Sequence, residues 1–233
     1  MSLPPRFDEL SSSYDDLLRD PLRDRFTGQE PMFFHHRKSE LIRRFFRRRK
    51  IETSGLHHLD VGCGKGELLN LLRGDFAHSA GCDVSADMMR EITGIETRVQ
   101  TDPLKIPFED EAFDLVTAVC VYHHVPPASR AALTQEIRRV LKTGGIFCMI
   151  EHNPRNPVTR LIVSRTPVDA DAVLLEAGEA RGLTAGTGLL TAEQAYFLYF
   201  PQMLYRYLGR LEGMLAKVPL GGQYALFSQR SLA

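Results

Sequence analysis

Apolar residues in the middle of the chain form short continuous runs separated by amphipathic stretches. Four mainly apolar runs of strand length predict buried strands, at 56–61, 79–84, 113–121 and 146–151, and the more polar stretch 96–101 is also predicted to be a strand. Two stretches with helical apolar periodicity, 67–73 and 129–142, predict helices, and Ser85 caps the predicted start of another. Because strands and helices alternate, the pattern predicts an α/β fold with a Rossmann-like, doubly wound and mainly parallel sheet.

The segments on either side of this alternation are less regular. Residues 39–50 carry four apolar residues on one face and basic residues on the other, which predicts an amphipathic helix. The basic face suits peripheral contact with a membrane surface or another anionic partner, or a solvated helix face, and the net charge of zero favours the solvated face. Beyond the fifth strand we expect a loop at 152–157, a helix at 169–181, a strand at 194–200, a helix at 201–217 and a strand at 223–230. The capping-box spacing of Thr191 and Gln194 leaves a helix start open as an alternative to the strand.

Composition narrows the class of protein. The 233 residues include 29 basic and 29 acidic side chains, so no overall field favours nucleic acid. No run of 18 apolar residues occurs, and residues 1–5 lack the features of a signal peptide, so we expect a cytoplasmic protein without a transmembrane segment. No two cysteines form a C-x-x-C pair, and we expect reduced thiols at all four: Cys63, Cys82, Cys120 and Cys148. The oligomeric state is not indicated.

A glycine-rich corner links the first predicted strand to the first predicted helix. Its pattern is Asp60-x-Gly62-x-Gly64-x-Gly66, and glycine lets the chain turn sharply and a ligand approach the backbone. The third glycine comes one position early for the dinucleotide fingerprint G-x-G-x-x-G, which counts against an NAD-dependent oxidoreductase. No P-loop lysine pattern is present. An acid at the strand end suits a ligand with cationic groups and no phosphate.

This corner resembles motif I of the class I S-adenosylmethionine-dependent methyltransferases. The segment from Asp83 to Met88 resembles the second motif of that family, and the segment from Asp102 to Asp114 resembles its third. The resemblance covers about residues 56–151, and it is closest to the small-molecule branch that includes the ubiquinone and menaquinone methyltransferases. It implies S-adenosylmethionine as cofactor, S-adenosylhomocysteine as product and a final antiparallel strand in the sheet.

The resemblance also implies a division of the chain and a set of cofactor residues. Residues 1–50 would form a helical arm or cap over the cofactor, and 51–233 the methyltransferase domain, with acceptor-side elements in 152–220. Asp83 would accept hydrogen bonds from the ribose, Met88 would pack on the adenine, and Asp102 would accept from the adenine amino group. The full cofactor set is Asp60, Gly62, Cys63, Gly64, Asp83, Val84, Met88, Asp102, Pro103, Leu104 and Cys120.

The acceptor side is less defined by the sequence. An alcohol or phenol acceptor needs a general base, and His123 and His152 are the candidates because imidazole titrates near neutral pH. On an extended chain His123 and His124 would point to opposite sides, and we expect His123 to face the pocket. The same geometry, without i, i+4 histidines or a cysteine cluster, predicts no metal site.

The predicted reaction is methyl transfer to a small-molecule acceptor, with nucleic acid disfavoured. No Asn/Asp-Pro-Pro-Tyr motif follows the fourth strand, where many methyltransferases of nucleic acids and proteins carry one. The aromatic residues at 196–200 favour an apolar or lipid-linked acceptor, although they also suit a core. The alternative function is a regulatory or scaffold protein that binds S-adenosylmethionine without catalysis.

Overall fold

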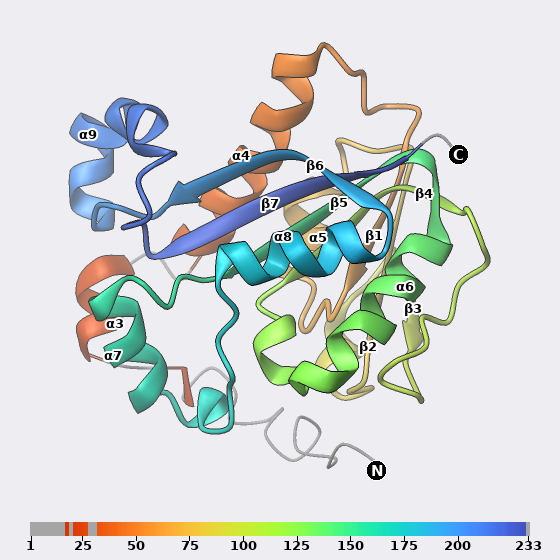
Figure 1. Ribbon diagram of the computed structural model, residues 1–233, viewed down its shortest axis with the longest axis horizontal. Coiled ribbons are helices and arrows are strands. Elements are labelled where there is room, and N and C mark those ends of the chain that lie inside the picture. Colours follow the sequence, from red (N-terminus) through yellow and green to blue (C-terminus); the bar gives the residue numbers. More distant parts are fainter. Residues whose placement is uncertain (1–16, 19–20, 28–31, 232–233) are drawn as a thin grey trace.

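The computed structural model describes residues 17–18, 21–27 and 32–231, and its centre is a seven-stranded sheet (Figure 1). The strands are β1 (His57–Val61), β2 (His78–Asp83), β3 (Glu96–Val99), β4 (Phe113–Val119), β5 (Leu141–His152), β6 (Leu189–Phe197) and β7 (Gln223–Arg230). Their order is β3-β2-β1-β4-β5-β7-β6, with β7 antiparallel to both neighbours and the other pairs parallel. The predicted fold class and antiparallel final strand are therefore confirmed.

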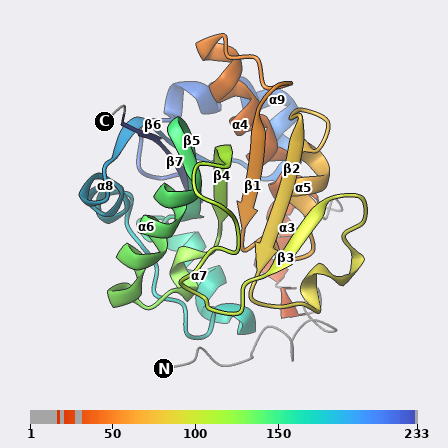
Figure 2. The ribbon, with the colours of Figure 1, turned by 90° about the vertical axis from the view of Figure 1, so that its right-hand side faces the viewer.

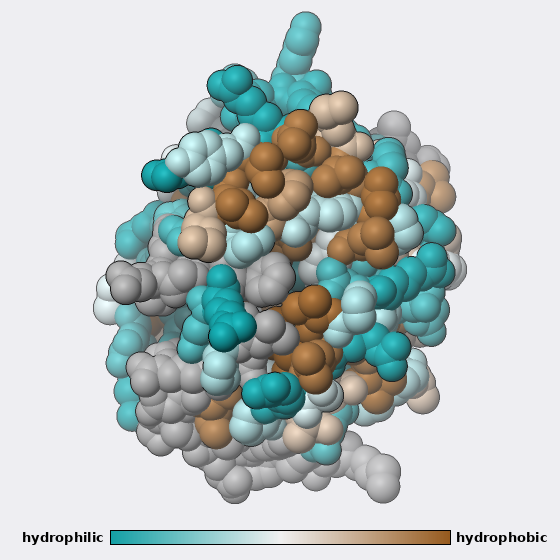
Figure 3. Space-filling view, turned by 90° about the vertical axis from the view of Figure 1, so that its left-hand side faces the viewer, coloured by the Kyte–Doolittle hydropathy of each residue, from teal (hydrophilic) through white to brown (hydrophobic). Residues whose placement is uncertain are grey.

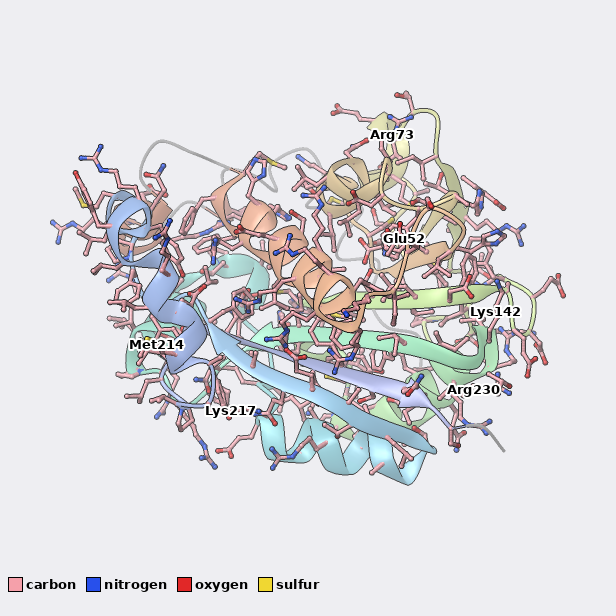
Figure 4. All side chains as sticks on the ribbon, turned by 90° about the horizontal axis from the view of Figure 1, so that it is seen from above. Glu52, Arg73, Lys142, Met214, Lys217 and Arg230 are labelled. Carbon is pink, nitrogen blue, oxygen red and sulfur yellow. The ribbon has the colours of Figure 1, made fainter. Side chains whose placement is uncertain are left out.

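Helices cover both faces of this sheet. The α-helices are α3 (Pro21–Thr27), α4 (Phe33–Arg49), α5 (Glu67–Leu72), α6 (Arg130–Val140), α7 (Pro157–Arg165), α8 (Ala177–Gly186) and α9 (Gln202–Leu215). Figure 2 shows α4 and α5 on one side of the strands and α6 and α8 on the other, and Figure 4 shows the sheet between α4 and α8. The sheet thus has buried side chains on both faces, as a doubly wound fold requires.

The chain reverses its direction of travel across the sheet between β1 and β4. From β1 it proceeds outward to β2 and β3, and it then returns to β4 on the other side of β1. In open α/β sheets such a switch point leaves a crevice at the carboxyl ends of the strands, where ligands bind. The fold therefore places the glycine corner after β1 and the His123–His124 segment after β4 at one crevice.

Helix α4 packs its apolar face into the core and turns its basic face outward. Phe45 is 1% exposed and its ring stacks on that of Phe227 in β7, with centroids 4.0 Å apart. On the outer face Arg43 pairs with Asp75 at 2.7 Å, and Arg49 pairs with Glu193 at 2.9 Å. These ion pairs favour the solvated face over the anionic-partner alternative. The proposed domain boundary at residue 50 stays a prediction.

The structure corrects several predicted elements. The helix expected after Ser85 is a single 3-10 turn, Met88–Glu91. The loop expected at 152–157 is confirmed at 153–156, between β5 and α7, but α7 itself was not predicted, and the helix expected at 169–181 lies at α8 instead. The 194–200 strand is confirmed but begins earlier, at Leu189, so the alternative of a helix start there is wrong. Of the predicted N-terminal arm, residues 1–16, 19–20 and 28–31 lie outside the described residues, within which each helix is too short or too polar to cross a bilayer.

Candidate active site

A cavity of about 1130 Å³ lies at the carboxyl ends of β1, β2 and β4. Its wall includes the residues that directly follow these strands, Gly62, Val84 and Cys120, together with parts of α4 and α7. Small-molecule sites are about 300–1,000 Å³ in volume. The cavity therefore has room for a nucleoside cofactor and a second molecule beside it.

The glycine corner is shaped by backbone conformations that side chains rarely adopt. Gly62, Gly64 and Gly66 have φ values of 69°, 53° and 78°. A Cβ at Gly62 would lie 2.5 Å from Cγ2 of Val121, which follows β4. The glycines are therefore required both by the turn and by the close packing of the β1 and β4 loops.

Asp60 presents a buried carboxyl group to this cavity from the end of β1. It is 3% exposed, and Oγ1 of Thr117 donates a hydrogen bond to its Oδ1 at 2.5 Å. Burial raises the pKa of Asp60 to about 7, against the opposing effects of the Thr117 hydrogen bond and the Lys38 ammonium. A carboxyl group in this position is suited to a ligand that brings a positive charge.

Asp83 holds the glycine corner and the segment after β2 together. Its Oδ2 accepts a hydrogen bond from the backbone N–H of Gly64 at 2.8 Å, and its Oδ1 accepts from Ser85 at 2.9 Å. The backbone of Met88 donates to Oγ of Ser85 at 3.1 Å. Because a carboxylate can accept about four hydrogen bonds, Asp83 keeps the capacity to accept from ribose hydroxyls.

The structure brings together most of the predicted cofactor residues. Nine of them line the cavity: Asp60, Gly62, Cys63, Gly64, Asp83, Val84, Met88, Pro103 and Cys120. Asp102 and Leu104 lie outside the lining, and Oδ1 of Asp102 instead accepts from the backbone of Leu104 at 2.9 Å. Gln100 lines the cavity and was missed, although a polar residue near the end of the predicted third strand was a usable signal.

Cys120 lies beside one cationic group and one neutral amide on the other wall. Nζ of Lys38, from α4, lies 3.7 Å from its Sγ, and Nε2 of Gln223 lies 3.5 Å away. Burial disfavours the thiolate, but Lys38 and His152 outweigh this and lower the pKa of Cys120 to about 7. The residue has a φ of 58°, so its side chain is held at a sharp turn after β4.

His123 is locked between two carboxylates. Its Nδ1 lies 2.6 Å from Oε2 of Glu151, at the end of β5, and its Nε2 lies 3.5 Å from Oδ1 of Asp169. Burial opposes the charged ring, but Glu151 and Asp169 outweigh it and raise the pKa of His123 to about 10. The other oxygen of Glu151 accepts from the backbone of Val121 and Tyr122 at 2.9 and 2.7 Å. At neutral pH His123 is therefore protonated, and it holds the carboxylates of Glu151 and Asp169 in place.

His124 faces the cavity as well, which the expected extended chain did not allow. Tyr122–His124 is a 3-10 turn, so the rings of His123 and His124 lie with centroids 4.1 Å apart instead of on opposite sides. Nε2 of His124 lies 3.5 Å from Oδ1 of Asp169. Burial and the charge on His123 lower the pKa of His124 to about 4, so its ring is neutral and can accept a proton.

The structure therefore assembles a cluster of three histidines and a carboxylate, His123, His124, His152 and Asp169, on the cavity wall. The ring of His152 lies 5.1 Å from that of His123. Atoms of His123, His124 and Asp169 that could bind a metal lie within 4.8 Å of one another, but the ion pairs already account for this geometry. Asp169 was not predicted as a site residue from the sequence, where it stood at the start of the helix predicted at 169–181.

Comparisons with known proteins agree with the geometry. Residues 59–149 match the family described as Methyltransferase domain. Sterol 24-C-methyltransferase ERG6B of Gibberella zeae is 37% identical over 107 residues, covering 42% of this chain and 28% of that protein. Probable tRNA methyltransferase 9B of Homo sapiens is 37% identical over 90 residues, covering 37% of this chain and 19% of that protein. The chain thus spans less than a third of the length of these two relatives.

A solved structure extends the similarity to nearly the whole fold. The S-adenosylmethionine-dependent methyltransferase of Thermotoga maritima, described as a possible histamine N-methyltransferase, superposes with a TM-score of 0.67. It is 14% identical, and the match covers 97% of this chain and 98% of that one, so it shows the fold alone. Residues 59–149 thus match a methyltransferase domain, and the chain has the fold of the S-adenosylmethionine-dependent methyltransferases.

Proposed function

We propose that the protein transfers the methyl group of S-adenosylmethionine to an oxygen of a small apolar or lipid-linked acceptor. The observation that supports this most is one cavity with two kinds of wall. Buried carboxyl groups, Asp60 and Asp83, line it beside the glycine corner, and neutral His124 with Asp169 lines it elsewhere. Val125, Ile162 and many other apolar side chains complete the lining.

The cofactor residues fit the chemistry of that ligand. Asp60 would face its positive charge, Asp83 its ribose hydroxyls, and Met88 and Pro103 its base. The bound cofactor supplies a methyl group on a sulfonium, which is already a good leaving group, so alignment of the acceptor is the main requirement. The glycine corner, packed closely against Val121, would hold the cofactor in place for that alignment.

The acceptor oxygen must lose a proton during transfer. We assign its acceptance to the neutral ring of His124, whose Nε2 lies 3.5 Å from Oδ1 of Asp169, a carboxylate that would stabilise the imidazolium that forms. His123, the base expected from sequence, carries its proton at neutral pH and is better suited to hold Asp169 in place. His152 remains a predicted participant through its contact with this cluster.

The proposal is tested by binding and turnover measured separately. S-adenosylhomocysteine should raise the melting temperature, and its heat of binding should be measurable by titration calorimetry. Turnover should then be followed as S-adenosylhomocysteine release with quinols, lipid-linked alcohols, amines and transfer RNA as acceptors. Transfer RNA is included among the acceptors because one of the similar proteins is named as a probable tRNA methyltransferase. Turnover of an alcohol or quinol supports the proposal, and preferred turnover of transfer RNA overturns it. Binding without turnover of any acceptor favours the scaffold alternative.

A further inference from the structure

Helix α9 is attached to the body of the protein through a buried charge. Glu212 is 2% exposed, and its Oε1 accepts from the backbone of Leu198 at 2.7 Å and from the hydroxyl of Tyr205. Its Oε2 accepts from Nη2 of Arg37, in α4, at 2.6 Å. The inner face of α9 is therefore polar at its centre, whereas the inner face of an ordinary surface helix is apolar.

The apolar face of α9 points outward. Met203, Tyr207, Leu211 and Met214 recur at spacings of four, four and three, so they share one face of the helix. They are 69%, 65%, 45% and 79% exposed. The apolar surface continues past the helix end through Leu220, which is 58% exposed. Figure 3 shows brown side chains gathered over this part of the molecule, and an exposed apolar surface of this kind marks an interaction site.

The charges beside this face are positive. Arg206 and Arg210 lie on α9, and Lys217 follows it, all three exposed. The only acidic residue of α9 is the buried Glu212. If a second copy of the chain docked through the same face, the positive charges of the two copies would lie close together and repel one another. An anionic bilayer accommodates both features, since apolar side chains enter the boundary of the acyl chains while arginine and lysine contact the phosphates.

The face adjoins the cavity. Tyr199 lines the cavity, and its hydroxyl donates to the carbonyl of Leu215, the last residue of α9, at 2.7 Å. On α7, Ile162 lines the cavity while Leu161 is 48% exposed beside it in sequence. Figure 4 places Met214 and Lys217 at the end of the molecule opposite Arg73 and Arg230. The cavity wall and the exposed apolar face are therefore parts of one end of the protein.

We propose that α9 docks this protein on the surface of an anionic lipid bilayer. The apolar face enters the headgroup region, and Arg206, Arg210 and Lys217 contact the lipid phosphates. Docking in this orientation would present the cavity to an acceptor held in the bilayer, and that part of the inference rests on the proposed function. Helix α4, for which the sequence offered membrane contact as one alternative, buries its apolar face and pairs Arg43 with Asp75 and Arg49 with Glu193.

Vesicle flotation tests the docking directly. The full chain should float with vesicles of equal parts phosphatidylcholine and phosphatidylglycerol, and much less with phosphatidylcholine alone. The triple variant Met203→Ser, Tyr207→Ser, Met214→Ser should lose at least about tenfold in partitioning. The matched control, Leu190→Ser on β6, removes an apolar residue of 58% exposure elsewhere and should float as the unmodified chain does.

The charge contribution has its own matched pair. Each arginine removed in Arg206→Gln and Arg210→Gln should lower partitioning about fivefold, the equivalent of roughly 1 kcal/mol per basic residue at an anionic surface. Arg47→Gln with Lys50→Gln, on the exposed end of α4, should change it little. Equal flotation of the α9 and control variants, or no flotation of the unmodified chain, overturns the docking proposal. A dimer in sedimentation that the triple variant dissociates, without flotation, assigns the face to a second copy and also overturns it.

Binding of S-adenosylhomocysteine separates this proposal from the proposed function. Each variant should show the same rise in melting temperature with S-adenosylhomocysteine as the unmodified chain, which also verifies that it is folded. If the unmodified chain floats but shows no such rise, the docking stands and the proposed function fails.

Discussion

The two sides of the cavity differ in how far apart along the chain their residues lie. The cofactor side is assembled within one continuous stretch, from Asp60 to Pro103, at the ends of adjacent strands. The acceptor side joins His123 after β4, Glu151 at the end of β5 and Asp169 beyond α7. The first side is therefore fixed by local turns and strand order, and the second only by the completed tertiary fold.

The two sides also differ in how their charge is balanced. On the cofactor side Asp60 is buried with its pKa raised to about 7, so this wall has a deficit of positive charge that a cationic ligand can supply. On the acceptor side burial opposes ionisation of Glu151 and Asp169, but His123 outweighs it and lowers the pKa of each carboxyl. The imidazolium of His123 therefore neutralises one of these two negative charges, and the other remains beside His124.

The strongest way to separate the two sides is to remove the acceptor-side carboxylate. Asp169→Asn should lower the turnover rate by about 10²–10⁴, because the proton acceptor loses the charge that stabilises it. Affinity for S-adenosylhomocysteine, measured by calorimetry, should stay within about twofold because Asp169 has no part in the cofactor wall. The control Asp110→Asn changes an exposed aspartate that pairs with Arg139 and should leave both quantities unchanged. If Asp169→Asn lowered affinity for S-adenosylhomocysteine as much as it lowered turnover, the two sides of the cavity would not act independently.

The reverse change should act on the cofactor side. Asp83→Ala removes the hydrogen bonds to the backbone of Gly64 and Ser85 as well as those proposed to the ribose. We expect an affinity loss for S-adenosylhomocysteine of about 100-fold, since two hydrogen bonds to a charged group contribute roughly 1.5 kcal/mol or more each. Asp102→Ala is the matched control and should cost less than about threefold, because Asp102 lies outside the cavity lining. Similar losses of affinity in both variants would mean that Asp102 also contacts the cofactor.

These contrasts explain how much could be predicted from the sequence. The sheet and the glycine corner were predictable because apolar runs and glycines act locally, and nine of the eleven proposed cofactor residues line the cavity. Helix α7 was missed although Asn156 caps it, with its side chain accepting from Thr159 at 3.0 Å, and Pro157 opens it. Those two residues were assigned to a turn-rich loop because prolines and asparagines favour turns as strongly as helix starts.

The acceptor side could be predicted only in part. His123 and His152 were recognisable as titratable groups after strands, but the 3-10 turn that aligns His124 with His123 leaves no periodic signal over three residues. The carboxylates that set their protonation come from 28 and 46 positions beyond His123, where Glu151 and Asp169 have no marker in the sequence. Charge balance in the cavity therefore depends on contacts that only the folded chain supplies.

Alkaline pH should weaken the acceptor side specifically. The pKa of His123 is raised from 6.5 to about 10, so its contribution to the free energy of unfolding is fully present below pH 6.5. That contribution declines as the pH rises and is lost above about 10. The melting temperature should therefore fall by on the order of several degrees between pH 7 and 10, given about 2–4 °C per kcal/mol for a chain of this size.

The variant Glu151→Gln provides the comparison for this pH dependence. It removes one of the carboxylates that hold the proton on His123, so the fall should begin at lower pH and the protein should already be less stable at pH 7. Differential scanning calorimetry over the pH series measures both. An unchanged pH profile in Glu151→Gln would show that His123 does not carry the dependence.

The smallest expected effect is a difference in reactivity between the two cysteines that line the cavity. Cys63 and Cys120 both line the cavity, but burial, followed by the carboxylates of Asp60 and Asp83, raises the pKa of Cys63, whereas Lys38 helps to lower that of Cys120 to about 7. Because the thiolate is the reactive form, iodoacetamide at pH 7.5 should alkylate Cys120 at least about tenfold faster than Cys63, as followed by peptide mass spectrometry. Lys38→Met should slow alkylation of Cys120 and leave that of Cys63 unchanged, and denatured protein should react equally at both. Equal rates in the folded protein would mean that the cofactor wall and the wall beside Lys38 do not differ in electrostatic potential, and the contrast between the two sides would then rest on geometry alone.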